Sequence, residues 1–186
     1  MKSFTNNEAV SPVVGVMLML VVTIIIAAVV SAFAGGISGT ADKAPQVQIK
    51  GTYSISDGMT IEHIGGSAIG TIDTIVMVRP TKTFGDAEHM IWTINKSTIV
   101  NSPTADAGSK NAWMREDGYS GEKNFAAGST AYINPPYHLD KFLQPGASKY
   151  GTYSFNCTAN IGKTFWLELA DSSGKVFAQS EVTITS

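Results

Sequence analysis

The sequence is poor in cysteine and in charged residues. Its 186 residues hold a single cysteine, Cys157, so no intrachain disulfide can form and the fold must be stabilised by packing alone. Charged residues make up 15%, and the net charge is −2. That balance supplies neither the basic surface that binds nucleic acid nor the polybasic patch that binds anionic lipid. We therefore expect no nucleic-acid partner.

Motifs for catalysis, cofactor binding and metal binding are also missing from the sequence. The histidines are His63, His89 and His138, and none has a partner at a metal-site spacing such as H-E-x-x-H. The chain has no phosphate-binding loop, dinucleotide fingerprint or nucleophile elbow. We expect a protein that is not an enzyme, with no catalytic residues, no cofactor and no metal. His63 is expected to end a strand and to hydrogen-bond the following turn.

One long stretch, Val10 to Ala41, contains no charged side chain. As a helix rising ~1.5 Å per residue, its most apolar part, Val13 to Ala34, is long enough to cross a hydrocarbon layer of ~30 Å. Ser11 is a suitable cap and Pro12 a suitable first residue for this helix. We expect a hydrophobic helix over residues 10–36, a linker over 37–46 and a globular head over 47–186. The helix-head joint is assigned to three glycines, Gly35, Gly36 and Gly39.

The composition of this stretch is compatible with two roles for the predicted helix. It is typical of a permanent single-pass membrane anchor. Ala32-Phe33-Ala34 also provides an A-x-A pattern, which would make the stretch a secretory signal removed after Ala34.

The junction at the start of this stretch resembles a known family. The string Glu8-Ala9-Val10-Ser11-Pro12-Val13-Val14-Gly15-Val16, followed by the aliphatic run, is similar to the N-terminus of archaeal type IV pilins with their class III signal peptide. The resemblance implies that residues 1–9 are a leader peptide, which a prepilin peptidase removes between Ala9 and Val10. Bacterial type IV pilins usually have Glu at the fifth mature position, which is Val14 here. This difference favours the archaeal branch.

The resemblance also implies a function and partners. The chain would be a structural subunit of a surface filament, a homopolymer that serves adhesion. Its precursor would stay in the archaeal plasma membrane until an assembly ATPase and its platform protein add it to the extracellular filament. The alternative is a single-pass membrane-anchored extracellular β-domain that acts as a binding module. The residues expected to form the filament core are Pro12, Gly15, Leu18, Val22, Thr23, Ile26, Val29 and Phe33.

After residue 44 the pattern changes to short alternating segments separated by turn residues. The predicted strands are Val47–Ile49, Met59–Ile64 after an Asp57-Gly58 turn, Thr71–Arg79, Met90–Asn95, Lys149–Thr158, Lys163–Ala170 and Lys175–Thr185, with Asp171–Gly174 as the last turn. Together they predict an α+β protein in which a long hydrophobic N-terminal helix precedes an all-β head, either an immunoglobulin-like β-sandwich or a related small β-sheet head.

Residues 101–147 have the weakest pattern. Short elements are expected there at Thr130–Ile133 and His138–Leu143, because a structureless loop of that length is rare. The segment is rich in aromatic residues, and we expect some of them to pack on the sheet: Trp113, Tyr119, Phe125, Tyr132, Tyr137 and Phe142.

Two N-glycosylation acceptor patterns occur, at Asn95 and Asn156. If the segment around Cys157 is a strand, Tyr153, Phe155 and Cys157 share one face. The sequence therefore predicts a buried Cys157, with Asn156 on the opposite face.

Overall fold

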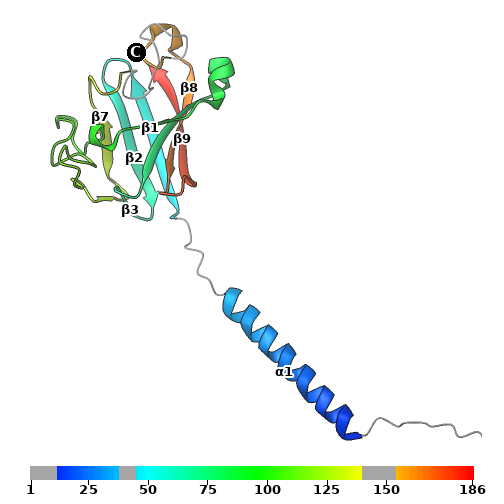
Figure 1. The fold of residues 1–186 in the computed structure, drawn as a ribbon. Helices are drawn as coiled ribbons and strands as arrows, with labels where there is room; N and C mark the ends of the chain where they lie inside the picture. The colour runs from blue at the N-terminus through cyan, green and yellow to red at the C-terminus, as the bar shows by residue number, and fades with distance from the viewer. Residues whose placement is uncertain (1–11, 38–44, 140–153) are drawn as a thin grey trace, which may run out of the picture. The chain divides into compact units, whose positions relative to one another are not determined.

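The computed structural model describes residues 12–37, 45–139 and 154–186. The chain divides into two compact units, Met1–Lys43 and Ala44–Ser186. Figure 1 shows the helix of the first unit and the β-rich second unit. The elements are α1 (Pro12–Ile37), β1 (Val47–Ser54), β2 (Gly58–Gly66), β3 (Ile69–Gly70), β4 (Ile75–Pro80), η1 (Lys82–His89), β5 (Trp92–Thr93), η2 (Lys96–Thr98), β6 (Asn124–Phe125), β7 (Thr130–Ile133), η3 (Thr158–Asn160), β8 (Thr164–Ala170) and β9 (Val176–Thr185).

The predicted long helix is present as α1, and the predicted α+β class with a β head is confirmed. Gly35 and Gly36 do not end the helix, because α1 continues through both to Ile37. Each costs only about 1 kcal/mol relative to alanine, which is too little to break hydrogen bonds that the neighbouring turns support. The expected cap Ser11 and the third glycine, Gly39, lie outside the described residues.

The head is built on a seven-stranded sheet of order β5-β4-β8-β9-β1-β2-β7, beside a two-stranded sheet of β3 and β6. The predicted hairpins are confirmed. Strands β1 and β2 pair antiparallel around the Asp57-Gly58 turn, in which Gly58 has φ +98°. In the second hairpin, β8 and β9 pair antiparallel around the Asp171–Gly174 turn, where the Gly174 N–H donates to the Asp171 carbonyl.

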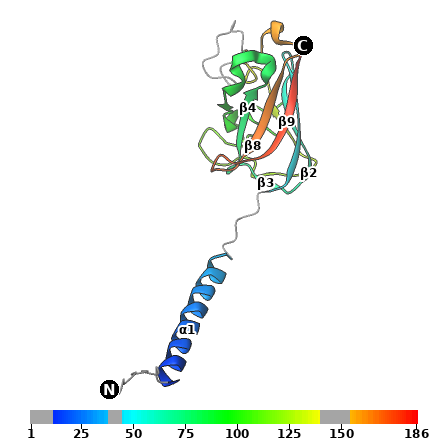
Figure 2. The ribbon, with the colours of Figure 1, turned by 90° about the vertical axis from the view of Figure 1, so that its right-hand side faces the viewer.

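A short parallel contact joins the two ends of the head sequence. Tyr53 pairs with Ile184, and Ser54 with Thr185. Nearby, the N–H of Gly51 on β1 donates to Ser180 Oγ on β9 (3.0 Å), so a side-chain hydroxyl replaces a ladder carbonyl. Figure 2 shows β4, β8 and β9 side by side. The immunoglobulin-like sandwich is not confirmed, because these strands form one curled sheet.

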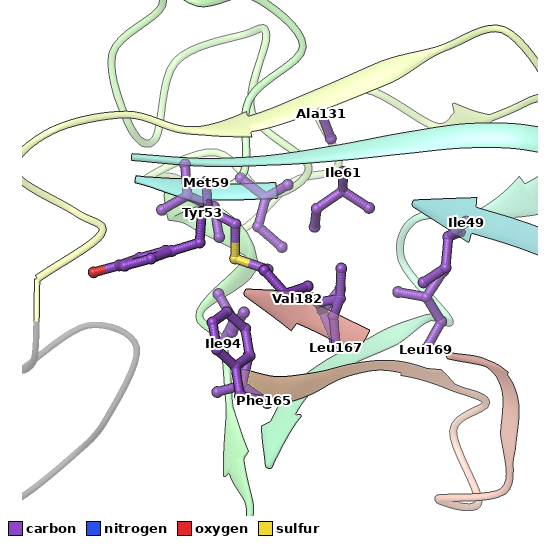
Figure 3. Close-up of a cluster of buried hydrophobic side chains, with 14 of the residues drawn as sticks. Ile49, Tyr53, Met59, Ile61, Ile94, Ala131, Phe165, Leu167, Leu169 and Val182 are labelled. Atoms are coloured by element: carbon purple, nitrogen blue, oxygen red, sulfur yellow. The ribbon is translucent and has the colours of Figure 1, made fainter. Parts of the chain in front are cut away.

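Curling places one face of the sheet inside the head. In Figure 3, Ile49, Met59 and Ile61 from β1 and β2 point towards side chains of β8 and β9. The facing residues include Phe165, Leu167, Leu169 and Val182, and all four are fully buried. The hydrophobic core is therefore continuous between the two halves of the sheet.

An aromatic cluster closes one end of this core. Phe155 stacks on Phe165 with ring centres 4.2 Å apart, and Tyr53 meets the edge of Phe165 at 5.8 Å. Phe84 and Trp92 contact the same Phe155 ring at 5.6 and 6.2 Å. Such aromatic pairs each contribute about 0.5–1.5 kcal/mol beyond their area burial.

Three predicted strands need correction. Residues 154–158 of the predicted Lys149–Thr158 strand form a turn and the start of η3, and residues 149–153 lie outside the described residues. Phe155 is buried as expected, but Cys157 is half-exposed, because a turn does not alternate its side chains between two faces. The strand predicted over Met90–Asn95 is only Trp92–Thr93, and that predicted over Thr71–Arg79 begins at Ile75.

Other local predictions are confirmed. His63 is 1% exposed, and its Nε2 lies 3.0 Å from the carbonyl of Ser67, as predicted, although β2 continues to Gly66 and His63 does not end the strand. Strand β7 is the predicted Thr130–Ile133 element. Among the aromatic residues of the poorly patterned region, Trp113 and Phe125 are buried against each other, whereas Tyr119 is 72% exposed. His138 lies in a turn, and Phe142 lies outside the described residues.

Gly51 provides a test of the close packing between β1 and β9. A Cβ atom at this position would lie 2.5 Å from Val182 Cγ2 and 3.0 Å from Leu167 Cδ2, both buried. We expect Gly51→Ala to lower the free energy of unfolding of the head by about 1–3 kcal/mol, because overpacking forces the core to shift. Chemical denaturation of the full chain in detergent, followed by tryptophan fluorescence, measures this.

The matched control is Gly65→Ala on the neighbouring strand, where the nearest atom to the added Cβ is Gln48 Oε1 at 3.6 Å. It should change the unfolding free energy by less than about 1 kcal/mol relative to wild type, since a strand favours alanine over glycine. Equal effects of the two substitutions would contradict the packing described for Gly51.

Candidate assembly helix and head surface

Helix α1 consists of 26 residues without an acid in its first turn or a base in its last. Its apolar side chains surround the whole circumference, so it has no polar face to turn to water. Pro12–Ala34 is long and apolar enough to cross a membrane by length and composition. At ~1.5 Å per residue these 23 residues extend about 35 Å, slightly more than a hydrocarbon layer of ~30 Å.

Every side chain from Pro12 to Ala34 is exposed, with the large apolar ones ranging from 45% at Val14 to 73% at Met19. The hydroxyl of Thr23 donates to the carbonyl of Leu20 at 2.9 Å, so this polar group is satisfied within the helix. A surface of this kind is stable in lipid or against other apolar helices, and it is costly in water.

The residues expected in a filament core fall largely on one side of α1. Gly15, Leu18, Val22, Ile26, Val29 and Phe33 follow one another at intervals of three or four residues, which places them along a single stripe of the helix. Pro12 and Thr23 lie beside this stripe. A Cβ added at Gly15 would meet nothing within 4 Å, so the glycine leaves room for a neighbouring helix. The cleavage pair, Ala9 and Val10, lies outside the described residues.

The two glycosylation candidates occupy different local structures. Asn95 is exposed at the N-terminus of η2, and its Oδ1 accepts the N–H of Ser97 at 3.0 Å. This bond uses the oxygen of the side-chain amide and not the nitrogen that a glycan would modify. Asn156 is half-buried in the turn that precedes η3, so the strand face on which we expected it does not exist.

The head shows ionisable groups in structural roles. Arg79 on β4 donates to Glu168 on β8, with Nη2 2.5 Å from Oε1, and Glu168 is 4% exposed. A hydrogen bond from the Ser173 hydroxyl, joined by backbone N–H groups of the same turn, lowers the pKa of Asp171. Burial lowers the pKa of Lys96, against the opposing effect of Asp73. Within the described ranges, no three His, Cys, Asp or Glu side chains are grouped closely enough to hold a metal ion.

The outer face of the sheet carries threonines that no sequence motif pointed to. Thr164, Thr183, Thr52 and Thr60 come from four neighbouring strands and face away from the core. The residues themselves are visible in the sequence, with one threonine in each of β1, β2 and β8 and two in β9. Their presence was not decisive, because threonine is a common residue on any exposed strand.

Two comparisons bear on the identity of the chain. Residues 8–49 match the family described as archaeal type IV pilin, N-terminal. An uncharacterized protein of Archaeoglobus fulgidus is 40% identical over 76 residues, which are 39% of this chain. The matched part covers 53% of that relative, so this chain spans about half of its length.

The family match contains the junction at Glu8 and Ala9, all of α1 and the start of β1. It confirms the resemblance drawn from Glu8 to Val16. Over residues 8–49 the chain matches the archaeal type IV pilin N-terminal family.

Proposed function

We propose that the protein is a structural subunit of an archaeal type IV pilus, which polymerises through α1 and serves surface adhesion. The observation that carries this proposal is a charge-free helix with an exposed apolar circumference, within a segment that matches the pilin N-terminal family. The chemistry of such a protein is assembly, so it needs no catalytic site and no cofactor.

The proposed life of the subunit has two stages. The precursor is held in the archaeal plasma membrane by α1, and a prepilin peptidase removes residues 1–9 between Ala9 and Val10. An assembly ATPase and its platform protein then add the mature chain to the filament. The helix over residues 10–36 forms the core of the homopolymer, the linker over 37–46 connects it to the head, and the head over 47–186 faces the exterior.

Transfer of α1 from the membrane to the filament has a low energetic cost. Moving an uncharged helix from lipid to a bundle of like helices exchanges one apolar environment for another, so little hydrophobic free energy is lost. Small residues at Gly15, Ala27 and Ser31 permit close approach of neighbouring helices. The internal hydrogen bond of Thr23 leaves its hydroxyl satisfied in both environments.

Cleavage at the proposed junction can be tested directly. N-terminal sequencing of the protein from the cell surface should give Val10 as the first residue, because the family's peptidase acts before the hydrophobic helix. A chain that begins at Met1 would support the permanent membrane anchor instead. A chain that begins at Gly35 would support ordinary secretion and would contradict a filament core made of α1.

A charge in the middle of α1 should prevent assembly. Thr23→Lys places an ammonium group where the helix is surrounded by lipid or by other helices, at a cost of roughly 2.5–3.5 kcal/mol per subunit on insertion scales. We expect electron microscopy of the mutant to show at least tenfold fewer filaments.

The control for this substitution is Thr23→Val, which removes the hydroxyl that donates to the Leu20 carbonyl but adds no charge. It should assemble as wild type does. Immunoblots of membrane fractions establish that both variants are made and inserted. Abundant normal filaments of Thr23→Lys would rule out α1 as the filament core.

Glycosylation at Asn95 and Asn156 remains a proposal for the exported protein. The exposed amide of Asn95 makes it the better acceptor of the two, because Asn156 is half-buried. The intact mass of the mature chain from its native source should exceed the mass of the polypeptide by at least one glycan. Asn95→Gln should remove that excess, and a wild-type mass equal to the bare polypeptide would exclude the modification.

A further inference from the structure

A row of hydroxyl side chains crosses the outer face of the large sheet. Thr164 on β8 is opposite Thr183 on β9, and Thr52 on β1 is opposite Thr60 on β2. The parallel pairing of Tyr53 with Ile184 places Thr52 beside Thr183, which joins the two pairs. We call the set Thr81, Thr164, Thr183, Thr52, Thr60 and Tyr132 the hydroxyl row. At ~4.8 Å between strands, its six positions extend about 24 Å.

Side-chain hydrogen bonds hold the hydroxyl row at its Thr81 end and again between Thr52 and Thr60. Thr81 follows β4 directly. Its Oγ1 is 2.8 Å from Thr164 Oγ1 and also donates a hydrogen bond to the Thr164 carbonyl. Further along, the hydroxyls of Thr52 and Thr60 are bonded to each other. Tyr132 continues the row on β7, because it pairs with Thr60. The row is therefore held in a fixed geometry by the strand register.

Two hollows run along this row and meet at Glu181. The first, of about 390 Å³, lies over β4, β8 and β9 and is lined by Arg79, Thr81, Lys82, Thr83, Thr164, Trp166 and Glu181, with Pro80. The second, of about 420 Å³, lies over β9, β1 and β2, and its lining includes Thr52, Ser54, Asp57, Thr60, Thr183 and Thr185. Glu181 lines both hollows, and together the two cover the hydroxyl row from β4 to β2; we call this pair of adjoining hollows the trough.

Trp166 gives the trough an aromatic surface. Trp166 lies two residues after Thr164 on β8, on the same face of the sheet. It pairs with Arg79 of β4 on one side and with Glu181 of β9 on the other, and its side chain is partly exposed. A tryptophan next to hydroxyl groups combines an apolar ring face with hydrogen-bond donors and acceptors. A sugar ring matches this combination, because its C–H face can stack on the indole ring while its hydroxyl groups bond to the threonines.

Charge argues for an uncharged ligand. The hydroxyl row itself contains no Asp, Glu, His, Lys or Arg, and Arg79 on the lining is already paired with Glu168. The remaining charged residues on the lining have both signs: Lys82 is positive, and Glu181 and Asp57 are negative. Neither a polyanion nor a polycation finds a surface of opposite sign there.

We propose that the trough along the hydroxyl row binds an extended neutral polysaccharide, with a sugar ring stacked on Trp166 and further sugar hydroxyls bonded to Thr164, Thr183 and Thr52. This assigns a ligand class to the adhesive role and rests to that extent on the proposed function. A single open trough binds weakly, and repetition of the head along a filament raises the overall avidity.

The binding test uses the full chain in detergent micelles, so it does not depend on filament assembly. Crystalline cellulose and chitin are the neutral probes, and polygalacturonate and chitosan, both immobilised on beads so that bound protein sediments, are the charged ones. We expect sedimentation with at least one neutral probe and none with the charged probes. Trp166→Ala should weaken this binding at least tenfold, whereas Trp166→Phe should retain most of it because an aromatic face remains.

A pair of isosteric substitutions tests the hydroxyl row without removing Trp166. The double variant Thr52→Val and Thr183→Val removes two exposed hydroxyls from the trough, and it should weaken binding about tenfold because each lost hydrogen bond costs about half to one power of ten. Its matched control is Thr93→Val with Thr104→Val, two exposed threonines outside the trough, which should bind as wild type does. Thermal melting of each variant shows whether the head is folded.

Three results would overturn the proposal: no sedimentation with either neutral probe, sedimentation with the charged probes alone, or equal binding by the trough variant and its control. Each of these leaves the filament proposal intact, because filaments are counted separately. Loss of filaments in Thr23→Lys with unchanged polysaccharide binding would confirm that the two properties belong to different parts of the chain.

Discussion

Helix α1 has no charged residue to hold it in water, and this constraint governs the rest of the protein. Burying its side chains is worth about 25 cal/mol for each Å² of apolar surface, so a free subunit in water would be strongly driven to aggregate. The backbone of the helix is already hydrogen-bonded within the segment, so lipid and a bundle of like helices satisfy it equally. The same surface can therefore anchor a precursor and hold together a polymer.

Because α1 is committed to apolar surroundings, the head must be stable by its own contacts. The curled sheet provides them, with Ile61, Phe165 and Val182 fully buried between its two halves. The parallel contact of β1 with β9 brings the first strand of the head to its last, so the closing of the sheet depends on residues far apart in the sequence. Gly51 allows this approach, and the hydroxyl of Ser180 satisfies the N–H that the missing ladder bond would leave unpaired.

The outer face of the same sheet has a different design. Most inward positions carry apolar residues, whereas the outward positions of β1, β2, β8 and β9 carry mainly threonine, glutamine, glutamate, one lysine and Trp166. Strand pairing then aligns these side chains into the hydroxyl row. A fold that needs only one buried face thus leaves the second face available for recognition.

Local patterns were sufficient for much of the fold. The uncharged run, Pro12 and the string from Glu8 to Val16 identified the helix and its family, because membrane and assembly constraints act on a contiguous segment. The Asp57-Gly58 and Asp171–Gly174 turns were also predictable, since their chemistry involves neighbouring residues. The strand around Phe155 was predicted wrongly. Phe155 is apolar because it stacks on Phe165 from a turn, and its neighbours do not pair with another strand.

What the sequence determined by itself is therefore the helix, its apolar character, the resemblance of its N-terminal segment to the pilin family and the alternation of most strands, all of which depend on residues close together in the sequence. Only the tertiary structure decided that the strands form one curled sheet, that β9 lies parallel to β1, and that Thr52 and Thr183 are neighbours. The physical reason is that strand order is set by pairings such as β2–β7, β4–β8 and β1–β9, whose partners are about 70 to 130 positions apart, and no local pattern records the energies of such contacts.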